Sequence, residues 1–397
     1  MGAAMAKADN RPQARPNEKT VRHVFAEQLY TGVGDEVRGN QLLTLEEGRI
    51  ASLEPMDVGA VPPDVIRTSI AAPGFIDVQI NGAADVLFNN DPTVGVIEKI
   101  AWGARQGGTA YILPTFITDA GDRYRSALAA VEEGLAMGVP GLLGVHLEGP
   151  FLSLQRPGIH PVRFIRPLET DDVEHLRAAQ CPILLTVAPE RQDHALLRQL
   201  AEAGITIFAG HSNATHEELL SAVDAGLSGA THLFNAQSPI AARAPGTVGT
   251  VLMHAGLRAG IIADGYHVHP QILAMASSLM GDRLFLVTDA MPTLAGEEPA
   301  FDLVGTRITL EDGRLTGPDG TLAGAHLAMD EAVRNAVAMM GVSVAQALRM
   351  ASGNAAQALG LQDELGKLLL GYRAGMTCLS ADLHAERVIV DGLVDDR

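Results

Sequence analysis

The chain of 397 residues contains only two cysteines, Cys181 and Cys378. Two cysteines cannot form the dense disulfide framework of small secreted domains, and the composition fits a protein of the reducing cytoplasm. Aromatic residues make up only 4% of the chain, although 47% of its residues are hydrophobic. We therefore expect Ala, Val, Leu and Ile to fill a large hydrophobic core.

Positive charge and long apolar runs are also scarce. The 29 Lys and Arg residues are outnumbered by 47 Asp and Glu residues, which gives a formal net charge of −18. This charge argues against a nucleic acid as partner, and an anionic substrate would need a locally positive pocket. The apolar runs are too short, and too often interrupted by Gly or charge, to span a bilayer, so we expect no membrane partner either.

The two ends of the chain differ in their sequence pattern from its central part. Residues 1–20 are polar and lack the apolar segment of a signal peptide, so we predict a disordered tail. Residues 21–72 contain short strand-like runs separated by Gly, Asp and Pro, and residues 365–397 have the same pattern. Because neither region is long enough for a good sheet, we predict that the two pair into one small β-sandwich domain.

In residues 73–364, apolar runs alternate with helical patterns, which is typical of parallel βα units. The apolar runs are 75–80, 110–115, 142–147, 183–187, 205–210, 229–232, 260–264 and 284–288. Eight units predict a TIM-like (β/α)8 barrel. The alternative is an open doubly wound sheet, which would need a G-x-G-x-x-G turn after an early strand, and none stands there. A Gly- and Asp-rich stretch at 301–324 predicts a β-hairpin inserted beyond the eighth strand.

Ionisable side chains gather at the predicted C-terminal ends of these strands, where an α/β barrel carries its ligand-binding residues. Glu148 follows the third run, His211 follows the fifth, His232 ends the sixth and Asp289 follows the eighth. One carboxylate and two neutral imidazoles are a common set of metal ligands that leaves a position open for water. Taken singly, the histidines could also be unrelated loop residues, and Asp289 could be the N-cap of a helix.

Other residues could complete such a site. A carboxylate at Asp289 that faces a metal-bound water can accept its proton, and His267 could polarise a carbonyl oxygen. Arg243 lies in the loop after His232 and is the candidate for holding a phosphate, because a guanidinium group offers phosphate two parallel donors. An exposed arginine is, however, more often simply solvated.

Seven motifs occur in order and with consistent spacing between residues 71 and 360. They are PGFIDVQING (73–82), HLEGPF (146–151), GHSNAT (210–215), THLFNA (231–236), ADGYHV (263–268), LVTDA (286–290) and LAG (322–324). Together they resemble the N-acetylglucosamine-6-phosphate deacetylases, a branch of the amidohydrolase superfamily. The set is specific as a whole, although no single motif is.

This resemblance implies a metal-dependent hydrolase that converts N-acetylglucosamine 6-phosphate to glucosamine 6-phosphate and acetate. It implies that Glu148, His211 and His232 bind the metal, that Asp289 is the catalytic acid and base, and that His267 contacts the acetyl carbonyl or the sugar. The further substrate contacts that it implies are Ile159, His160, Asn235, Ala236, Arg243, Leu322, Ala323 and Gly324. It also implies a homodimer, in which Arg243 acts in its own or in the neighbouring subunit.

The chain departs from the wider superfamily at the end of the first strand. Where many amidohydrolases have His-x-His, this chain has Gln79-Ile80-Asn81. An amide is a poorer metal ligand than an imidazole, so we expect one divalent ion per chain, with Gln79 and Asn81 behind the ligands or at a vacant second-metal position. Zn is the first candidate, and Fe, Co or Mn would also fit. The alternatives are the same reaction on N-acetylgalactosamine 6-phosphate, another amidohydrolase reaction, or a barrel without activity.

Overall fold

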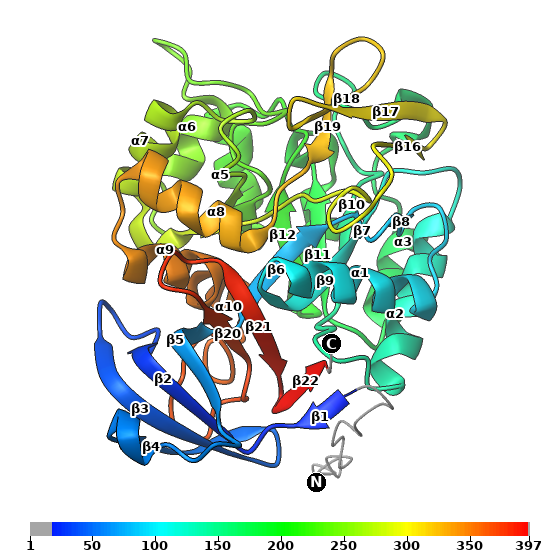
Figure 1. Ribbon diagram of the computed structural model, residues 1–397. Helices are drawn as coiled ribbons and strands as arrows, with labels where there is room; N and C mark the ends of the chain where they lie inside the picture. The colour runs from blue at the N-terminus through cyan, green and yellow to red at the C-terminus, as the bar shows by residue number, and fades with distance from the viewer. Residues whose placement is uncertain (1–17, 396–397) are drawn as a thin grey trace, which may run out of the picture.

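A parallel barrel forms the centre of the molecule (Figure 1). The computed structural model describes residues 18–395. The barrel strands pair in chain order and are β6 (Phe75–Ile80), β9 (Thr109–Ile117), β10 (Val145–Glu148), β11 (Ile183–Val187), β12 (Thr206–Ala209), β13 (Leu227–Ala230), β14 (Arg258–Ile261) and β15 (Leu284–Leu286). Each of the eight predicted runs contains one of these strands at least in part, so the predicted TIM-like (β/α)8 barrel is confirmed.

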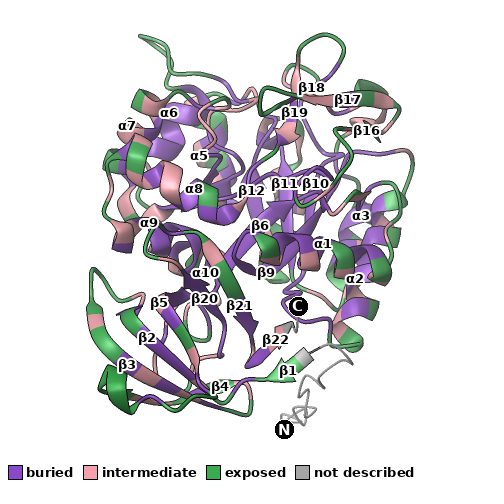
Figure 2. Ribbon diagram, viewed as in Figure 1, coloured by how far each residue is buried: buried purple, intermediate pink, exposed green. Residues whose placement is uncertain are grey.

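Helices surround the barrel because the outer faces of its parallel strands are apolar and need cover. Figure 2 shows buried strands enclosed by helices that are exposed only on their outer sides. The α-helices are α1 (Val94–Gln106), α2 (Arg123–Ala136), α3 (Thr170–Ala178), α4 (His194–Glu202), α5 (His216–Asp224), α6 (Gly246–Met253), α7 (Pro270–Met280), α8 (Met329–Asn335), α9 (Val344–Ala351) and α10 (Gly353–Ala358). The short helical turns are η1 (Val58–Ala60), η2 (Val162–Phe164), η3 (Pro189–Arg191), η4 (Gly281–Arg283) and η5 (Ala336–Met340), of which η5 is a π-helical turn. In residues 18–395, no helix combines the length and apolar character that crossing a bilayer requires.

The two chain ends form a separate sheet beside the barrel (Figure 1), as the pattern at 21–72 and 365–397 predicts. Its strands, in spatial order, are β1 (Glu18–Thr20), β22 (Leu393–Asp395), β21 (Ala385–Val390), β20 (Met376–Leu379), β5 (Ile66–Pro73), β2 (His23–Tyr30), β3 (Val37–Glu46) and β4 (Arg49–Pro55), all in one hydrogen-bonded sheet. The antiparallel β5–β20 pair joins the N-terminal to the C-terminal part. The predicted tail at 1–20 was three residues too long, because β1 pairs with β22; its residues 1–17 lie outside the described part of the chain.

The predicted hairpin at 301–324 was too small. An antiparallel sheet of four strands stands there, made of β16 (Ala300–Leu303), β17 (Thr306–Glu311), β18 (Arg314–Thr316) and β19 (Leu322–Ala325). Val304-Gly305 and Asp312-Gly313 form its first two turns with positive φ at both residues, the conformation that two-residue hairpin turns prefer. A further short pair, β7 (Gly82–Ala83) and β8 (Val86–Leu87), follows β6. Leu87 packs with side chains of the four-stranded sheet, which therefore covers one side of the barrel mouth.

The barrel closes between the end of β6 and the residues after β15. The backbone N–H of Asp289 donates to the carbonyl oxygen of Gln79 at 2.9 Å, those of Asn81 and Gly82 donate to the carbonyl oxygen of Ala290 at 2.9 and 3.1 Å, and side chains add further contacts. Asp77 is fully buried at this seam. Its Oδ1 accepts hydrogen bonds from the backbone N–H groups of Gln79 (3.2 Å) and Thr288 (3.3 Å), and its Oδ2 accepts one from the Thr288 hydroxyl. Burial raises the pKa of Asp77 to about 7, although these hydrogen bonds oppose the shift.

We expect Asp77→Asn to remove a pH-dependent loss of stability. Because the folded state holds the Asp77 proton more tightly than the unfolded chain, stability falls as pH rises from about 4 to about 7. Asparagine stays neutral and can still accept at Oδ1 and donate to Thr288. Relative to wild type, its free energy of unfolding should therefore rise by on the order of 2 kcal/mol between pH 5 and pH 7.

Urea denaturation at pH 5, 6 and 7 measures this difference. Asp57→Asn, which changes an exposed carboxylate beside η1, is the control and should show no such trend. A difference between Asp77→Asn and wild type that does not change with pH would contradict a buried, protonated Asp77.

Candidate active site

A cavity of about 400 Å³ opens at the C-terminal ends of the barrel strands. Residues that directly follow β6, β12, β13, β14 and β15 line it, together with Glu148 at the end of β10. Loops 155–160 and 235–236 form further parts of its wall, together with Leu322 and Gly324 of the four-stranded sheet and Thr321 just before β19. The strand ends that the sequence predicted to carry chemistry therefore share one cavity.

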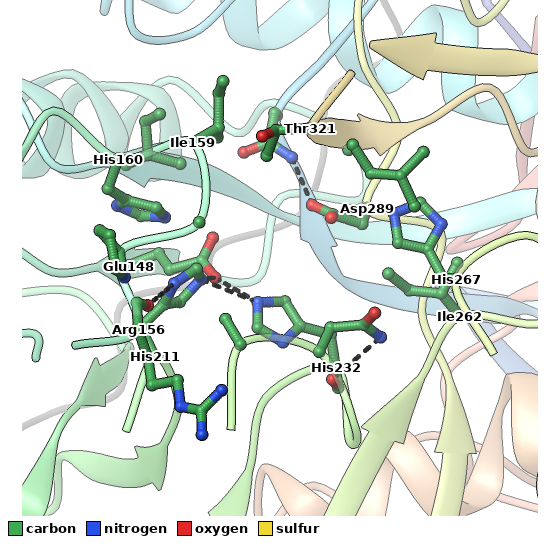
Figure 3. A pocket seen from close by; sticks show the side chains of 18 of the residues that line it. Glu148, Arg156, Ile159, His160, His211, His232, Ile262, His267, Asp289 and Thr321 are labelled. Carbon is green, nitrogen blue, oxygen red and sulfur yellow. Dashed lines mark hydrogen bonds and ion pairs between the residues drawn. The ribbon is translucent and has the colours of Figure 1, made fainter. Parts of the chain in front are cut away.

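Glu148, His211 and His232 converge at the bottom of this cavity (Figure 3). The Glu148 Oε1 atom lies 3.1 Å from Nε2 of His211 and 2.8 Å from Nε2 of His232, and these two nitrogens are 3.1 Å apart. All three residues are buried. His211 and His232 both have positive φ, at 47° and 30°, which is uncommon for a residue with a side chain and is found more often at functional sites than elsewhere.

The charges of this group depend on one another. Burial alone would raise the pKa of Glu148, but its hydrogen bonds with His211 and His232 hold that pKa well below the ordinary value. Burial alone would lower the pKa of His232, but contact with Glu148 raises it. Two ring nitrogens and one carboxylate oxygen that point at one centre need a proton or a cation between them.

The donor set fits a divalent metal ion. Nδ1 of His211 lies 3.0 Å from the carbonyl oxygen of Arg156 and, as a donor to that oxygen, leaves the Nε2 lone pair directed at the centre. Such a hydrogen bond behind a metal-binding histidine fixes its tautomer and ring orientation. Among residues 18–395, this is the one group of at least three His, Cys, Asp or Glu side chains whose ligand atoms lie close enough to hold an ion.

A layer of polar side chains supports the group from inside the barrel. The fully buried ring of His146 lies 3.1 Å from the Thr115 hydroxyl and 2.7 Å from the Thr186 hydroxyl, which in turn lies 2.6 Å from the Thr231 hydroxyl. Burial lowers the pKa of His146 to about 4, so this ring is neutral. The network ties β9, β10 and β11 to the residue before His232.

Asp289 lies across the cavity from Glu148 and His211 (Figure 3). Its Oδ1 accepts hydrogen bonds from the amide of Gln79 (3.1 Å) and from the amide of Asn81 (2.7 Å). Gln79 and Asn81 therefore hold this carboxylate, a contact that the sequence analysis did not foresee. Burial and the nearby charge of Glu148 raise the pKa of Asp289 to about 6. Asp289 also has positive φ, at 51°.

His267 lies beside Asp289 at the cavity wall (Figure 3). Its Nδ1 lies 2.6 Å from Oδ2 of Asp264, and its backbone N–H donates to Oδ1 of the same carboxylate at 2.9 Å. Burial opposes ionisation of Asp264, but its hydrogen bonds with His267 keep the pKa of Asp264 below the ordinary value. This carboxylate fixes the ring orientation of His267.

Most of the predicted substrate contacts line the cavity, namely Ile159, His160, Asn235, Ala236, Leu322 and Gly324. Ala323 does not. Alternate residues of a strand face opposite sides, so Ala323 points into the hydrophobic cluster of the four-stranded sheet, where it is fully buried. Its predicted place in the pocket was wrong for this reason.

Within one chain, Arg243 lies outside the cavity. It borders a second hollow on the surface, next to the apolar side chains of Ile240, Met253, Met275 and Leu279. The structure of the single chain therefore does not bring Arg243 together with Glu148, His211 and His232.

Several residues that line the cavity were not predicted from the sequence, among them Gln155, Arg156, Met291 and Thr321. Arg156 stands eight positions after Glu148 in the loop that follows the HLEGP segment, which was the available signal. Thr321 comes from the turn before β19. No motif in the sequence pointed to it, because only the folding of the insertion brings it over the barrel.

Comparison with known proteins adds to this geometry. The sequence pattern of the amidohydrolase family matches residues 70–394. The chain belongs to this family. Amidohydrolases are metal-dependent, and the group of Glu148, His211 and His232 is the part of this amidohydrolase that could hold the ion.

Relatives with assigned activities resemble the chain over most of its length. The N-acetylgalactosamine-6-phosphate deacetylase of Shewanella sp. (strain ANA-3) is 36% identical over 321 residues, which are 80% of this chain and 81% of that protein. The N-acetylglucosamine-6-phosphate deacetylase of Homo sapiens is 36% identical over 381 residues, which are 90% of each chain. The crystal structure of N-acetylglucosamine-6-phosphate deacetylase from Pasteurella multocida superposes with a TM-score of 0.87 at 32% identity, covering 93% of this chain and 98% of that one. The resemblance that the motifs predict is thereby confirmed.

Proposed function

We propose that this amidohydrolase removes the acetyl group from N-acetylglucosamine 6-phosphate and releases glucosamine 6-phosphate and acetate. The observation that carries the proposal is the pairing, in one cavity, of a buried Glu-His-His group with a carboxylate on the facing wall. Relatives named as deacetylases of hexosamine 6-phosphates support the substrate class. We further propose a cytoplasmic location and one divalent ion per chain, with Zn as the first candidate, held by Glu148, His211 and His232.

In this proposal the metal, when bound, supplies a Lewis acid that lowers the pKa of water and polarises the acetyl carbonyl. Asp289 takes the proton of the attacking water and then delivers it to the amide nitrogen, which leaves as an amine. Gln79 and Asn81 both donate to Oδ1 of Asp289, so neither of these amides occupies Oδ2, which stays available for the proton.

His267 is proposed to stabilise negative charge on the carbonyl oxygen. With Nδ1 donating to the Asp264 carboxylate, a second proton on the ring lets Nε2 donate into the cavity. Asp264 then balances the positive charge of the ring and prevents it from rotating. The residues Ile159, His160, Asn235, Ala236, Leu322 and Gly324 are proposed to hold the sugar.

A panel of substrates tests the proposal. The metal-loaded enzyme is assayed for acetate release from N-acetylglucosamine and N-acetylgalactosamine, each with and without the 6-phosphate. The proposal requires that the gluco 6-phosphate have the highest kcat/KM. The galacto substrate is the specific alternative, because the Shewanella relative carries that name. A preference for it would correct the sugar, and no acetate release from any substrate would contradict the deacetylase function.

Arg243 is proposed to bind the phosphate of a substrate held by the neighbouring subunit of a homodimer. Its exposed position outside its own cavity supports this arrangement, and so do the apolar side chains around it, since Met253 is 73% and Ile240 is 53% exposed. We expect Arg243→Ala to reduce kcat/KM for the phosphorylated substrate by about 30- to 150-fold, the effect of losing a charge-assisted pair. Activity on the unphosphorylated sugar should barely change.

Co-expression of two chains that are each impaired on the phosphorylated substrate tests which subunit uses Arg243. In a mixed dimer of Arg243→Ala with Asp289→Asn, one site has an intact Asp289 and faces the intact Arg243 of the other chain. Mixed dimers should therefore regain up to half of the wild-type activity. If the mixed dimers recover no activity, Arg243 would have to act within its own chain. If Arg243→Ala loses kcat/KM equally on the phosphorylated and the unphosphorylated sugar, Arg243 would only support the structure.

A further inference from the structure

We propose that Arg156 is a phosphate-binding residue that each chain supplies to its own active site. The inference rests on the proposed function for the identity of the substrate. The guanidinium group of Arg156 would then supply positive charge at the cavity wall whether or not a second chain contributes Arg243.

Arg156 lines the cavity and lies in the loop between Glu148 and His160. Its Nε donates to Oδ1 of Asn213 at 3.0 Å. Asn213 is itself fixed, because its backbone N–H donates to the Glu190 carboxylate at 2.7 Å and its amide donates to Gln155 at 2.6 Å. The guanidinium group is therefore held at one edge and does not swing freely in solvent.

Arg156 also lies on the same part of the wall as loop 235–236. The neighbour of Asn213, Ser212, donates its backbone N–H to the carbonyl oxygen of Ala236 at 3.1 Å. A Cβ atom added to Gly158 would lie 4.0 Å from the Cβ of Ala236. The loop that carries Arg156 and the loop that carries Asn235 and Ala236 thus form one continuous surface. An anionic group bound there could reach both.

The charge of Arg156 is available to a ligand. Its side chain hydrogen-bonds to the amide of Asn213 and not to a carboxylate, and in residues 18–395 no ion pair involves it. The other arginines of this loop are engaged elsewhere: Arg166 forms two hydrogen bonds with the carboxylate of Asp172, at 2.5 and 2.7 Å, and Arg163 stacks on Phe164. Among the described residues that line the cavity, Arg156 is the one guanidinium or ammonium group.

This charge matters because the chain as a whole repels the proposed substrate. A net charge of −18 disfavours a dianionic sugar phosphate, and the cavity itself contains the carboxylates of Glu148 and Asp289. A fixed guanidinium group with its outer nitrogens directed away from Asn213 can bind phosphate with two donors. The backbone carbonyl of Arg156 separately holds His211, so a side-chain substitution leaves that contact in place.

The test compares Arg156→Gln with Arg163→Gln in the metal-loaded, full-length protein. Both variants lose one positive charge from the same loop, but Arg163 is exposed, stacks on Phe164 and does not line the cavity. For N-acetylglucosamine 6-phosphate, we expect Arg156→Gln to lower kcat/KM by about 10- to 100-fold, mainly through KM. For unphosphorylated N-acetylglucosamine the loss should stay below about twofold. Arg156→Lys should recover part of the loss, since it restores the charge without the planar fork.

Calorimetric titration with inorganic phosphate gives a second readout that needs no turnover. Wild type and Arg163→Gln should bind phosphate alike, and Arg156→Gln at least about tenfold more weakly. Equal phosphate binding by all three proteins, or an equal loss of kcat/KM on both sugars, would overturn the proposal. If the wild type binds phosphate through Arg156 but releases no acetate, the deacetylase function fails while the assignment of Arg156 stands.

Discussion

Asp289→Asn is expected to leave the metal bound and to lower kcat by about 10²- to 10⁴-fold, the range that loss of a general acid or base produces. An asparagine at this position can still accept the two hydrogen bonds that Gln79 and Asn81 donate to Oδ1 of Asp289. Its amide nitrogen cannot take a proton from water or deliver one to the departing amine. The substitution therefore removes the proton transfer and keeps the shape and support of the side chain.

Asp119→Asn is the matched control. Asp119 is also a buried carboxylate after a barrel strand, but it binds Arg123 at 2.6 Å and does not line the cavity. Its variant should keep kcat within about threefold of wild type, as substitutions that touch no reacting group do. Metal content is measured on both variants by elemental analysis. If Asp289→Asn retains near-normal turnover with a full metal site, Asp289 does not transfer the proton and has only a structural role at the strand end.

The barrel could be predicted from the sequence because its signal is local. Each βα unit combines an apolar run with a helical pattern, and β6 and β11 begin and end where the sequence indicates. The run at 142–147 was less accurate, since β10 starts at Val145. Gly141 and Gly144 come too close to the backbone of Ala110 and Pro182 to be replaced by larger residues, so the chain before Val145 is shaped by packing and not by a strand pattern.

The active site was predictable where a side chain sits at a strand end, and less so where contacts depend on closure of the barrel. Glu148 ends a strand, and His211, His232 and Asp289 follow strands, so parallel pairing alone brings all four to one rim. The hydrogen bonds that join Gln79 and Asn81 to Asp289 connect residues about 210 positions apart in the chain. They form only because the first and last barrel strands meet. For this reason, the sequence left open whether Gln79 and Asn81 lie behind the ligands or at a vacant metal position, and it did not indicate that both amides donate to Asp289.

Side-chain direction was the other limit. Ala323 belongs to a recognisable motif, but the alternation of β19 turns it away from the cavity between two residues that line it. The resemblance implies a substrate contact for Arg243, but its loop places it at a different hollow of the same chain. Arg156 belongs to none of the seven motifs and lies in the cavity wall. A linear pattern locates the loops, whereas their contacts decide which way each side chain points.

Glu148→Gln is expected to abolish metal binding and to lower kcat/KM by at least about 10³-fold. In the proposed site Glu148 is the only anionic ligand, and its Oε1 atom lies within 3.1 Å of both histidine nitrogens. The site is buried, so a divalent cation held by two neutral imidazoles and an amide would have no anionic ligand in direct contact with it. Loss of a Lewis acid that stabilises charge by several kcal/mol corresponds to three or more decades in rate.

Metal content and thermal stability distinguish this effect from misfolding. After dialysis, wild type should retain about one ion per chain, because Gln79 and Asn81 are committed to Asp289, and the variant should retain almost none. Added metal should raise the Tm of the chelated wild type, because binding to the folded state alone stabilises it, and should leave the Tm of Glu148→Gln unchanged. The Asp119→Asn control should behave as wild type in both measurements. A Glu148→Gln variant that keeps a full equivalent of metal would contradict this site, because the ion would then be held elsewhere. A wild type that needs two ions for activity would contradict a single site, because the amides of Gln79 and Asn81 would have to release Asp289 to serve a second ion.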